Sequence, residues 1–196
     1  MLKRFLDIFL SLAILLAITP ILVFIAMAIK WGSKGPVFYR QVRIGKDGKP
    51  FQIFKFRTMR PDSDKLGLLT VGGRDPRITA IGYYLRKYKL DELPQFLNVL
   101  AGEMSIVGPR PEVKKYVDLY STEQKRVLEV RPGITDYASL LYKDENDVLA
   151  KYPDPEQAYI DIVMPHKLKI NLEYINNRSF WMDLKIIVLT AKGVIS

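Results

Sequence analysis

Residues 8–29, IFLSLAILLAITPILVFIAMAI, form a run of 22 residues without a charged side chain. A straight helix of that length would rise about 33 Å, which matches the hydrocarbon thickness of a bilayer. The run is too long for the apolar part of a cleaved signal peptide, and no small-residue cleavage site separates it from a mature domain. A buried core helix would be shorter and apolar on one side. The run therefore predicts a helix in contact with a membrane.

Both flanks of this run are basic, and a proline lies in its middle. A single span would place one basic flank on the outer face, against the positive-inside tendency. Pro20 removes a backbone donor, so we expect a helix break at Thr19–Pro20, with the Thr19 hydroxyl satisfying a freed backbone group. A re-entrant helix-break-helix over residues 1–34 agrees with both features and is favoured over a Pro-kinked single span. The flanking cations are Lys3 and Arg4 before the run, and Lys30, Lys34, Arg40 and Arg43 after it.

Composition narrows the remaining function classes. The chain has 196 residues, no cysteine, one histidine and a formal charge of +9. These values fit one water-facing domain, residues 35–196, and exclude a disulfide framework, a zinc ribbon and a thiol nucleophile. The presence of one histidine in the whole sequence also argues against a Ser-His-Asp triad. The positive charge indicates polyanionic partners: nucleic acid, phosphorylated small molecules or anionic lipid.

Residues 37–59 predict a β-hairpin that turns at Lys46-Asp47-Gly48. In its second strand, Phe51, Ile53, Lys55 and Arg57 would share one face, so the two cations form either a phosphate clamp or a solvated strand edge. Residues 61–77 are rich in Pro, Gly and Asp and predict a mobile loop, and residues 78–90 predict an amphipathic helix. Its mixture of aromatic and basic residues suits a membrane interface or single-stranded nucleic acid equally.

Residues 90–100 predict a second helix, which ends near Gly102 and carries Asp91 and Glu92 in its first turn. An acidic pair at a helix start is common and by itself indicates no catalysis. Its surroundings are unusual, since adjacent carboxylates facing many cations can hold a divalent metal and a pyrophosphate together. The cations are Arg74, Arg77, Arg86, Lys87 and Lys89 before the pair, and Arg110 after it. Arg110 lies in the stiff turn Gly108-Pro109-Arg110-Pro111, which is either a phosphate contact or a plain connector.

Five motifs occur in an order typical of a known family: Lys-Phe-Arg-Thr-Met (55–59), Asp-Pro-Arg-Ile-Thr (75–79), Leu-Asp-Glu-Leu-Pro-Gln-Phe-Leu-Asn-Val-Leu (90–100), Ser-Ile-Val-Gly-Pro-Arg-Pro-Glu (105–112) and Arg-Pro-Gly-Ile-Thr (131–135). With them the chain resembles the bacterial sugar transferases, specifically the small monotopic polyprenyl-phosphate phosphoglycosyl transferases. The resemblance extends from the N-terminus to about residue 135. The extra N-terminal membrane helices of larger relatives are missing, so we expect the minimal catalytic form.

The resemblance implies a UDP-sugar donor, undecaprenyl phosphate as acceptor, Mg²⁺ as cofactor, and a location on the cytoplasmic face of the bacterial inner membrane. It implies that Asp91 is the covalent nucleophile and that Glu92 assists the metal, with both carboxylates as metal ligands. The reaction would then release UMP through a phosphosugar intermediate on Asp91. The expected substrate-binding residues are Lys55, Arg57, Arg77, Arg86, Pro109, Arg110, Pro111 and Arg131.

The sequence thus predicts an α/β, mainly helical fold: a re-entrant membrane segment, then a small cytosolic domain with a β-hairpin and interfacial amphipathic helices. Residues 136–164 depart from the family pattern, which leaves the sugar undetermined. Residues 180–195 predict a helix that lies on the membrane or packs in the core. The rival interpretation is a membrane-anchored basic protein that binds nucleic acid or acts as a scaffold. Such a protein would not need Asp91 and Glu92.

Overall fold

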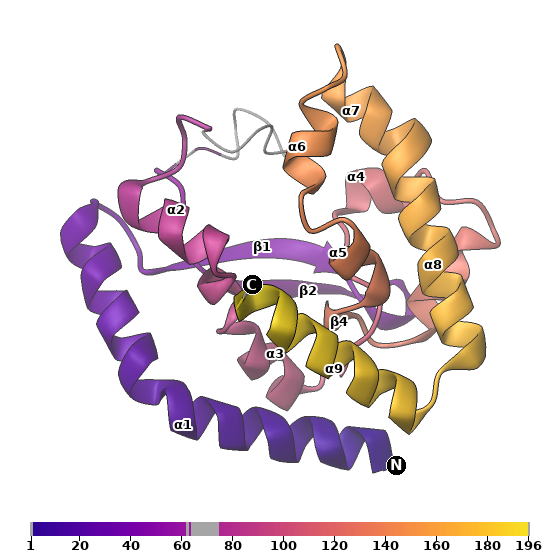
Figure 1. The fold of residues 1–196 in the computed structure, drawn as a ribbon, viewed down its shortest axis with the longest axis horizontal. Coiled ribbons are helices and arrows are strands. Elements are labelled where there is room, and N and C mark those ends of the chain that lie inside the picture. Colours follow the sequence, from indigo (N-terminus) through magenta and orange to yellow (C-terminus); the bar gives the residue numbers. More distant parts are fainter. Residues whose placement is uncertain (1, 62, 64–74, 196) are drawn as a thin grey trace.

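A computed structural model describes residues 2–61, 63 and 75–195 of the chain. The fold is mainly helical, with two small two-stranded sheets (Figure 1). The helices are α1 Leu2–Gly32, α2 Ala80–Lys87, α3 Gln95–Ala101, α4 Lys114–Val117, α5 Tyr137–Leu141, α6 Glu145–Leu149, α7 Pro155–Ala158, α8 Met164–Asn177 and α9 Phe180–Ile195. The strands are β1 Phe38–Ile44, β2 Pro50–Phe56, β3 Ser105–Val107 and β4 Gly133–Thr135. The predicted fold class is confirmed. Most of the loop predicted over residues 61–77 lies outside the described residues.

Helix α1 contains the apolar run and is long and apolar enough to cross a membrane. It bends in its middle, yet it stays helical through Pro20 (Figure 1). The predicted bend is therefore present, but without a non-helical interruption between two helices. The Thr19 hydroxyl donates to the carbonyl of Leu15 at 2.6 Å. It does not serve the carbonyl of Leu16, which loses its donor because Pro20 has no N–H. Back-bonding of this kind also bends helices.

The first turns of α1 are fixed to the water-facing domain by polar contacts. Arg4 donates to the carbonyl of Val99 at the end of α3, at 2.7 Å. The buried Asp7 carboxylate accepts from the Ser105 hydroxyl at 2.8 Å and from the backbone N–H of Ile106 at 3.1 Å. These charge-assisted bonds tie the start of the membrane helix to β3.

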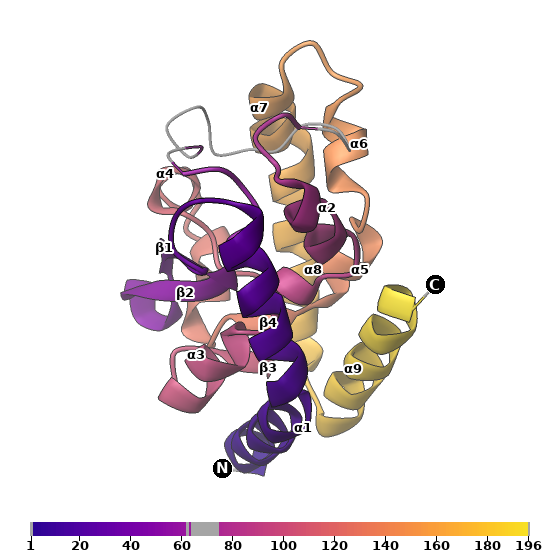
Figure 2. The same ribbon diagram turned by 90° about the vertical axis from the view of Figure 1, so that its left-hand side faces the viewer.

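The last turns of α1 are fixed to the same domain by apolar contacts. Ile25 and Ile29 are buried against Phe56 of β2 and Leu85 of α2. Figure 2 shows the bent helix lying along the domain, with α2 beside its upper part and α3 beside its lower part. Both ends of α1 therefore contact one folded body.

The predicted β-hairpin is present. β1 and β2 are antiparallel, with Tyr39 opposite Lys55. Asp47, in the turn, has φ 57°, a left-handed conformation that Asp tolerates well. Ile53 is buried in the main core, and Lys55, two residues further on, points from the same side of the strand toward Glu92. The hairpin thus carries a core residue and a site residue on one face.

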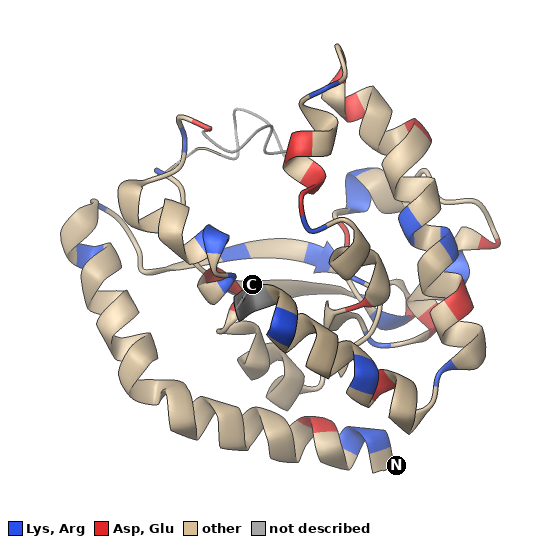
Figure 3. Cartoon of the chain, viewed as in Figure 1, with Lys and Arg blue, Asp and Glu red and all other residues tan. Residues whose placement is uncertain are grey.

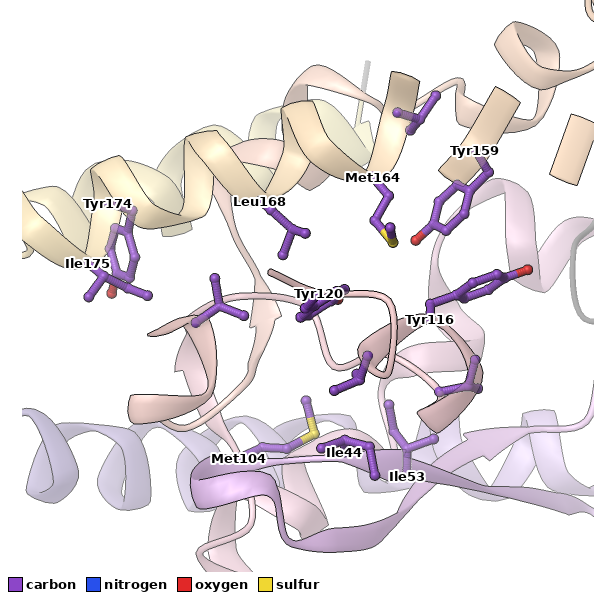
Figure 4. Packing of buried hydrophobic residues seen from close by; sticks show 14 of the residues in the cluster. Ile44, Ile53, Met104, Tyr116, Tyr120, Tyr159, Met164, Leu168, Tyr174 and Ile175 are labelled. Carbon is purple, nitrogen blue, oxygen red and sulfur yellow. The ribbon is translucent and has the colours of Figure 1, made fainter. Parts of the chain in front are cut away.

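The main core lies between the hairpin and α8 (Figure 4). Ile44 and Ile53 from the hairpin and Met104 from the segment before β3 form one side, and Leu168 and Tyr174 from α8 form the other. All five are buried, and burial of large apolar side chains is the main source of stability for a domain of this size. The short strands β3 and β4 pair in parallel, and both strands contact α9.

Helix α9 was predicted to lie on the membrane or to pack in the core, and it has one side suited to each role. Ile186 is completely buried, and Thr190 hydrogen-bonds Thr135 of β4 at 2.6 Å. The other side of the helix is apolar and exposed, with Trp181 73% accessible and Val188 also exposed. An apolar helix face that no part of the domain covers is typical of a helix lying at a membrane interface.

Candidate active site

Asp91 and Glu92 lie in a 3-10 turn, Leu90–Glu92, between α2 and α3. Lys89 before it is left-handed, with φ 54°, and this separates the turn from α2. The prediction that the acidic pair occupies the first turn of a helix is wrong, because α3 begins only after Pro94. Pro94 has no N–H to continue an α-helical bond, so the turn closes on the tighter 3-10 pattern.

The Glu92 carboxylate is clamped by two cations from distant segments. Lys55 of β2 donates to Oε1 at 2.9 Å, and Arg110 donates to both carboxylate oxygens, with its Nη1 3.2 Å from Oε2. Burial opposes ionisation of Glu92, but Arg110 and Lys55 together hold its pKa well below the ordinary value. Burial lowers the pKa of Lys55, and the Glu92 charge counteracts part of that effect. Glu92 is therefore fixed in both charge and orientation.

The Asp91 carboxylate is in a different situation. Its residue is 8% exposed, and no described residue donates a hydrogen bond to it. Burial, followed by the neighbouring Glu92 charge, raises the pKa of Asp91, while Lys55 and Arg86 act in the opposite direction. A buried carboxylate without donors keeps its lone pairs available, which is what a nucleophile or a metal ligand needs.

Arg110 is held by a stiff loop that leaves β3. A side chain on Gly108 would place its Cβ 2.5 Å from the carbonyl oxygen of Arg131, so the loop can approach the segment before β4 only with glycine here. The Pro109 carbonyl accepts from the N–H of Gly133 at 2.9 Å. The loop thereby presents Arg110 with little conformational freedom left to lose.

Two adjoining cavities, about 420 Å³ and about 220 Å³ in volume, open beside the acidic pair. Lys55, Arg86, Asp91 and Arg110 line both of them. Figure 3 shows the contrast over the whole chain: α1 carries no charge between its two ends, whereas basic and acidic residues gather where α2 meets the hairpin. A cavity with several cations around one available carboxylate suits a polyphosphate ligand.

Two further predicted substrate residues lie at the rim of the larger cavity, but they also have partners in the protein. Arg77 lines the cavity and pairs with Asp75 at 2.6 Å. Arg57 also lines it, while its guanidinium donates to the Ser33 carbonyl at 3.0 Å and to that of Lys34. Arg57 therefore binds the segment that directly follows α1, which links the membrane helix to the site.

Three predicted substrate residues do not line either cavity. Arg131 is exposed and donates to the carbonyl of Gly102 at 2.8 Å, at the end of α3. Pro109 and Pro111 stiffen the Arg110 loop and face a small hollow on its other side. The structure therefore does not support direct contact of these three residues with a ligand in the cavities. Pro109 and Pro111 instead shape the loop that carries Arg110.

Four further lining residues have no role in the sequence analysis. Glu145 and Asn146 of α6 and Lys167 of α8 line both cavities, and Tyr116 of α4 lines the larger one. Tyr116 lies between two of the family motifs, whereas Glu145 and Asn146 lie in the region where the family pattern is lost and Lys167 lies after it. They reach the site through tertiary packing.

Mg²⁺ is bound in proteins by one or two carboxylates, completed by water and substrate phosphate oxygens. In the part of the chain that the structure describes, no group of three or more His, Cys, Asp or Glu could form an all-protein cage. Asp91 offers a carboxylate without donors, and Glu92, beside it, retains acceptor capacity on Oε2, which receives only Arg110. This small set fits an ion that is shared with a bound diphosphate.

Comparison of the sequence with known proteins identifies its family and its relatives. Residues 1–196 match the bacterial sugar transferase family. The chain is 41% identical over 201 residues to the UDP-glucose:undecaprenyl-phosphate glucose-1-phosphate transferase of Escherichia coli (strain K12), covering 100% of the chain and 41% of that protein. It is 34% identical over 197 residues to the UDP-N-acetylgalactosamine-undecaprenyl-phosphate N-acetylgalactosaminephosphotransferase of Aeromonas hydrophila, covering 99% of the chain and 44% of that protein.

A third relative has a length close to that of this chain. The uncharacterized sugar transferase EpsL of Bacillus subtilis (strain 168) is 37% identical over 194 residues, covering 99% of the chain and 87% of EpsL. The chain spans less than half the length of the two relatives whose names state a donor sugar. Since the match to the family extends over the full sequence, from α1 through the acidic pair to α9, the chain belongs to the bacterial sugar transferase family.

Proposed function

We propose that the protein transfers a sugar phosphate from a UDP-sugar to undecaprenyl phosphate, giving undecaprenyl-diphosphate-sugar and UMP. One observation carries the proposal: the buried Asp91 carboxylate has no donor among the described residues and faces a cationic cavity beside a firmly clamped Glu92. The names of the E. coli and Aeromonas relatives support both the class of donor and the lipid acceptor.

In the first step, an Asp91 oxygen attacks the phosphorus that bears the sugar. The new bond joins this oxygen to phosphorus, and the bond from phosphorus to the UMP oxygen breaks, so UMP leaves with the electron pair. Phosphoryl transfer depends mostly on alignment and on stabilisation of charge on the phosphate oxygens. Lys55, Arg86 and Arg110 line the cavity at the place where that charge develops.

In the second step, an oxygen of the lipid phosphate attacks the same phosphorus, and the bond to Asp91 breaks. The lipid phosphate is already anionic at neutral pH, so no strong general base is required. This agrees with a site in which the lining residues of both cavities include no histidine. The acyl-phosphate intermediate divides one displacement into two.

Mg²⁺ would be held by Asp91 and Glu92 together with phosphate oxygens of the donor. When bound, it supplies positive charge that neutralises the diphosphate. The clamp on Glu92 keeps this residue ionised, so its remaining acceptor sites stay available at neutral pH. Removal of divalent ions with a chelator should therefore stop UMP release, and added Mg²⁺ should restore it.

The site would lie at the cytoplasmic face of the inner membrane. Both ends of α1 contact one domain, so the apolar bend would enter the bilayer from the side on which that domain lies. The cations on both flanks of the apolar run favour the cytoplasmic side. The lipid phosphate would then be at the level of the cavity, where Asp91 needs it.

The test is a UMP-release assay on purified protein in detergent or lipid nanodiscs, with Mg²⁺, undecaprenyl phosphate and a panel of UDP-sugars. Release that depends on both a UDP-sugar and the protein is the expected result. In the absence of the lipid, a burst of no more than one UMP per protein molecule should accompany the covalent adduct. Folded protein that releases no UMP from any donor in the panel would refute the proposal.

A further inference from the structure

The lining of the two cavities includes a polar pair that the proposed chemistry does not use. Glu145 and Asn146 form the start of α6, and both line both cavities together with Asp91. Leu149 at the end of the same helix is 1% exposed and anchors α6 in the main core. The pair is therefore presented from a fixed element, although α6 is short.

Glu145 itself is held in place. Lys167 of α8 donates to its Oε2 at 2.5 Å, and the side chains of both residues are largely buried. The Asn146 amide has no side-chain partner among the described residues, so its donors and acceptor remain available to a ligand. A preorganised carboxylate beside an unpaired amide is a combination that recognises specific hydrogen-bonding groups.

The charge of Glu145 indicates which part of the donor this pair of residues would bind. A carboxylate repels phosphate oxygens, and it lies near enough to Arg110 to favour the charged form of that guanidinium. The phosphates would accordingly contact the cations Lys55 and Arg110 rather than the Glu145 carboxylate. What remains for Glu145 is the neutral, hydroxyl-bearing part of the donor, since hydroxyl groups donate readily to a carboxylate.

We propose that Glu145 and Asn146 bind ring hydroxyl groups of the sugar in the UDP-sugar and thereby determine which sugar is transferred. This inference rests on the proposed function. The two carboxylate oxygens of Glu145 can accept from two neighbouring hydroxyls at once, and the Asn146 amide can bind a third polar group. A donor with a vicinal pair of free hydroxyls in the matching configuration is the chemistry that fits.

The two cavities differ in a way that separates the sugar from the ribose, which also carries hydroxyls. Asp91, Glu145 and Asn146 line both cavities, but Glu92 lines only the smaller one, in which every described lining residue has a polar or charged side chain. The larger cavity extends to Phe38, Tyr39 and Tyr116, whose rings suit a nucleobase. The sugar is bonded to the phosphorus that Asp91 would attack, so it belongs in the smaller cavity.

The test compares Glu145→Gln with the wild type, using kcat/KM for UDP-glucose, UDP-galactose, UDP-N-acetylglucosamine and UDP-N-acetylgalactosamine. We expect the preferred donor to lose about 10- to 100-fold, because a hydrogen bond to a charged group is replaced by a weaker one. Discrimination between donors that differ at one ring carbon should fall as well, while inhibition by UMP stays unchanged. Asp147→Asn is the matched control, because Asp147 lies exposed on the same helix and lines neither cavity.

Asn146→Ala is the second variant, since it leaves the Glu145–Lys167 pair intact and should also change donor preference. Equilibrium binding of the same donors and of UMP, measured in an Asp91→Asn background, separates recognition from turnover. Weaker UMP binding caused by Glu145→Gln would assign the pair to the ribose and overturn the proposal, as would an unchanged donor preference in both variants. If the wild type turns over no donor, discrimination in the binding assay still supports the sugar site, and its absence refutes it.

Discussion

Asp91 and Glu92 are adjacent in the chain, yet their environments assign them different tasks. Glu92 is held by Lys55 and Arg110 in a well-ionised state, whereas Asp91 is buried without a donor among the described residues. Two neighbouring acids whose pKa values are moved in opposite directions are typical of sites where each has its own role. The clamped carboxylate suits a supporting role, and the unclamped one suits the reaction with phosphorus.

The first prediction at this scale concerns Asp91→Asn. The amide is nearly isosteric but a poor nucleophile, so UMP release should fall by more than about 1,000-fold, the scale seen when a covalent nucleophile is removed. Intact-mass spectrometry of protein quenched without acceptor lipid should show the sugar-phosphate adduct on the wild type and none on the variant. Asp118→Asn, at an exposed pair with Lys114, is the control for loss of an acidic charge. Normal turnover by Asp91→Asn would exclude Asp91 as the nucleophile.

The second prediction concerns pH. Adduct formation requires ionised Asp91, and burial raises the pKa of this group, so the rate should fall on acidification at a higher pH than an exposed aspartate would give. The Lys55 charge favours the ionised form of Asp91. Lys55→Met should therefore move the acid limb of the pH–rate profile to still higher pH. Lys114→Met, on the exposed surface, should leave the limb in place. An acid limb that stays or moves to lower pH in Lys55→Met would contradict this electrostatic account.

Among the helices and strands, sequence patterns predict best the elements that depend on contacts between neighbouring residues. The hairpin follows from alternating side chains and a turn with Asp47 and Gly48, and it was correctly predicted. The acidic turn was assigned to the wrong element. Leu90 needs an α-helical donor from Pro94, which has none, and the structure supplies a 3-10 bond from Leu93 at 3.3 Å instead. The order of the motifs indicates the family without this geometry, and the family match over residues 1–196 confirms it.

The other parts of the site depend on contacts between distant segments, which no local pattern encodes. The parallel pair β3–β4 joins strands of three residues each, too short to show alternation. α6 and α8 bring Glu145 and Lys167 to the cavity from more than 50 residues beyond Asp91. Arg131 is the opposite case. It is a basic residue in a family motif, but its side chain donates to the carbonyl of Gly102 at the end of α3 instead of lining a cavity.

The element-scale prediction tests how α1 is attached to the domain. Asp7→Asn replaces a buried carboxylate that accepts from both Ser105 and the Ile106 N–H, and the amide group would meet one of these donors with its own N–H. We expect a loss of about 1–3 kcal/mol in the free energy of unfolding. The measurement is thermal unfolding in a fixed detergent, followed by circular dichroism. Asp47→Asn is the control, since Asp47 is exposed and asparagine accepts its left-handed backbone. Equal melting of the two variants would mean that Asp7 does not secure α1.

Across the protein as a whole, the attachment of the apolar helix and the candidate active site share contacts. Arg57 donates to the Ser33 carbonyl directly after α1 and also lines the larger cavity, and Lys3 links the start of α1 to Asp183 of α9 at 2.6 Å. The exposed apolar faces of α1 and α9 are therefore held in fixed positions relative to the acidic pair. A reaction between a soluble nucleotide-sugar and a lipid phosphate requires such a fixed height above the membrane.

The last prediction concerns topology, and the absence of cysteine from the chain makes it accessible to single-cysteine labelling. Leu2→Cys and Lys34→Cys report on the two flanks of the apolar run, and Ile21→Cys reports on its exposed middle. With a membrane-impermeant maleimide, both flank positions should label in inside-out vesicles and neither in spheroplasts, while the middle position should label in neither. A single span would label the two flanks in opposite preparations. That outcome would require the contacts of Arg4 with α3 or of Ile29 with Phe56 to be broken in the membrane, since both belong to one side of the domain.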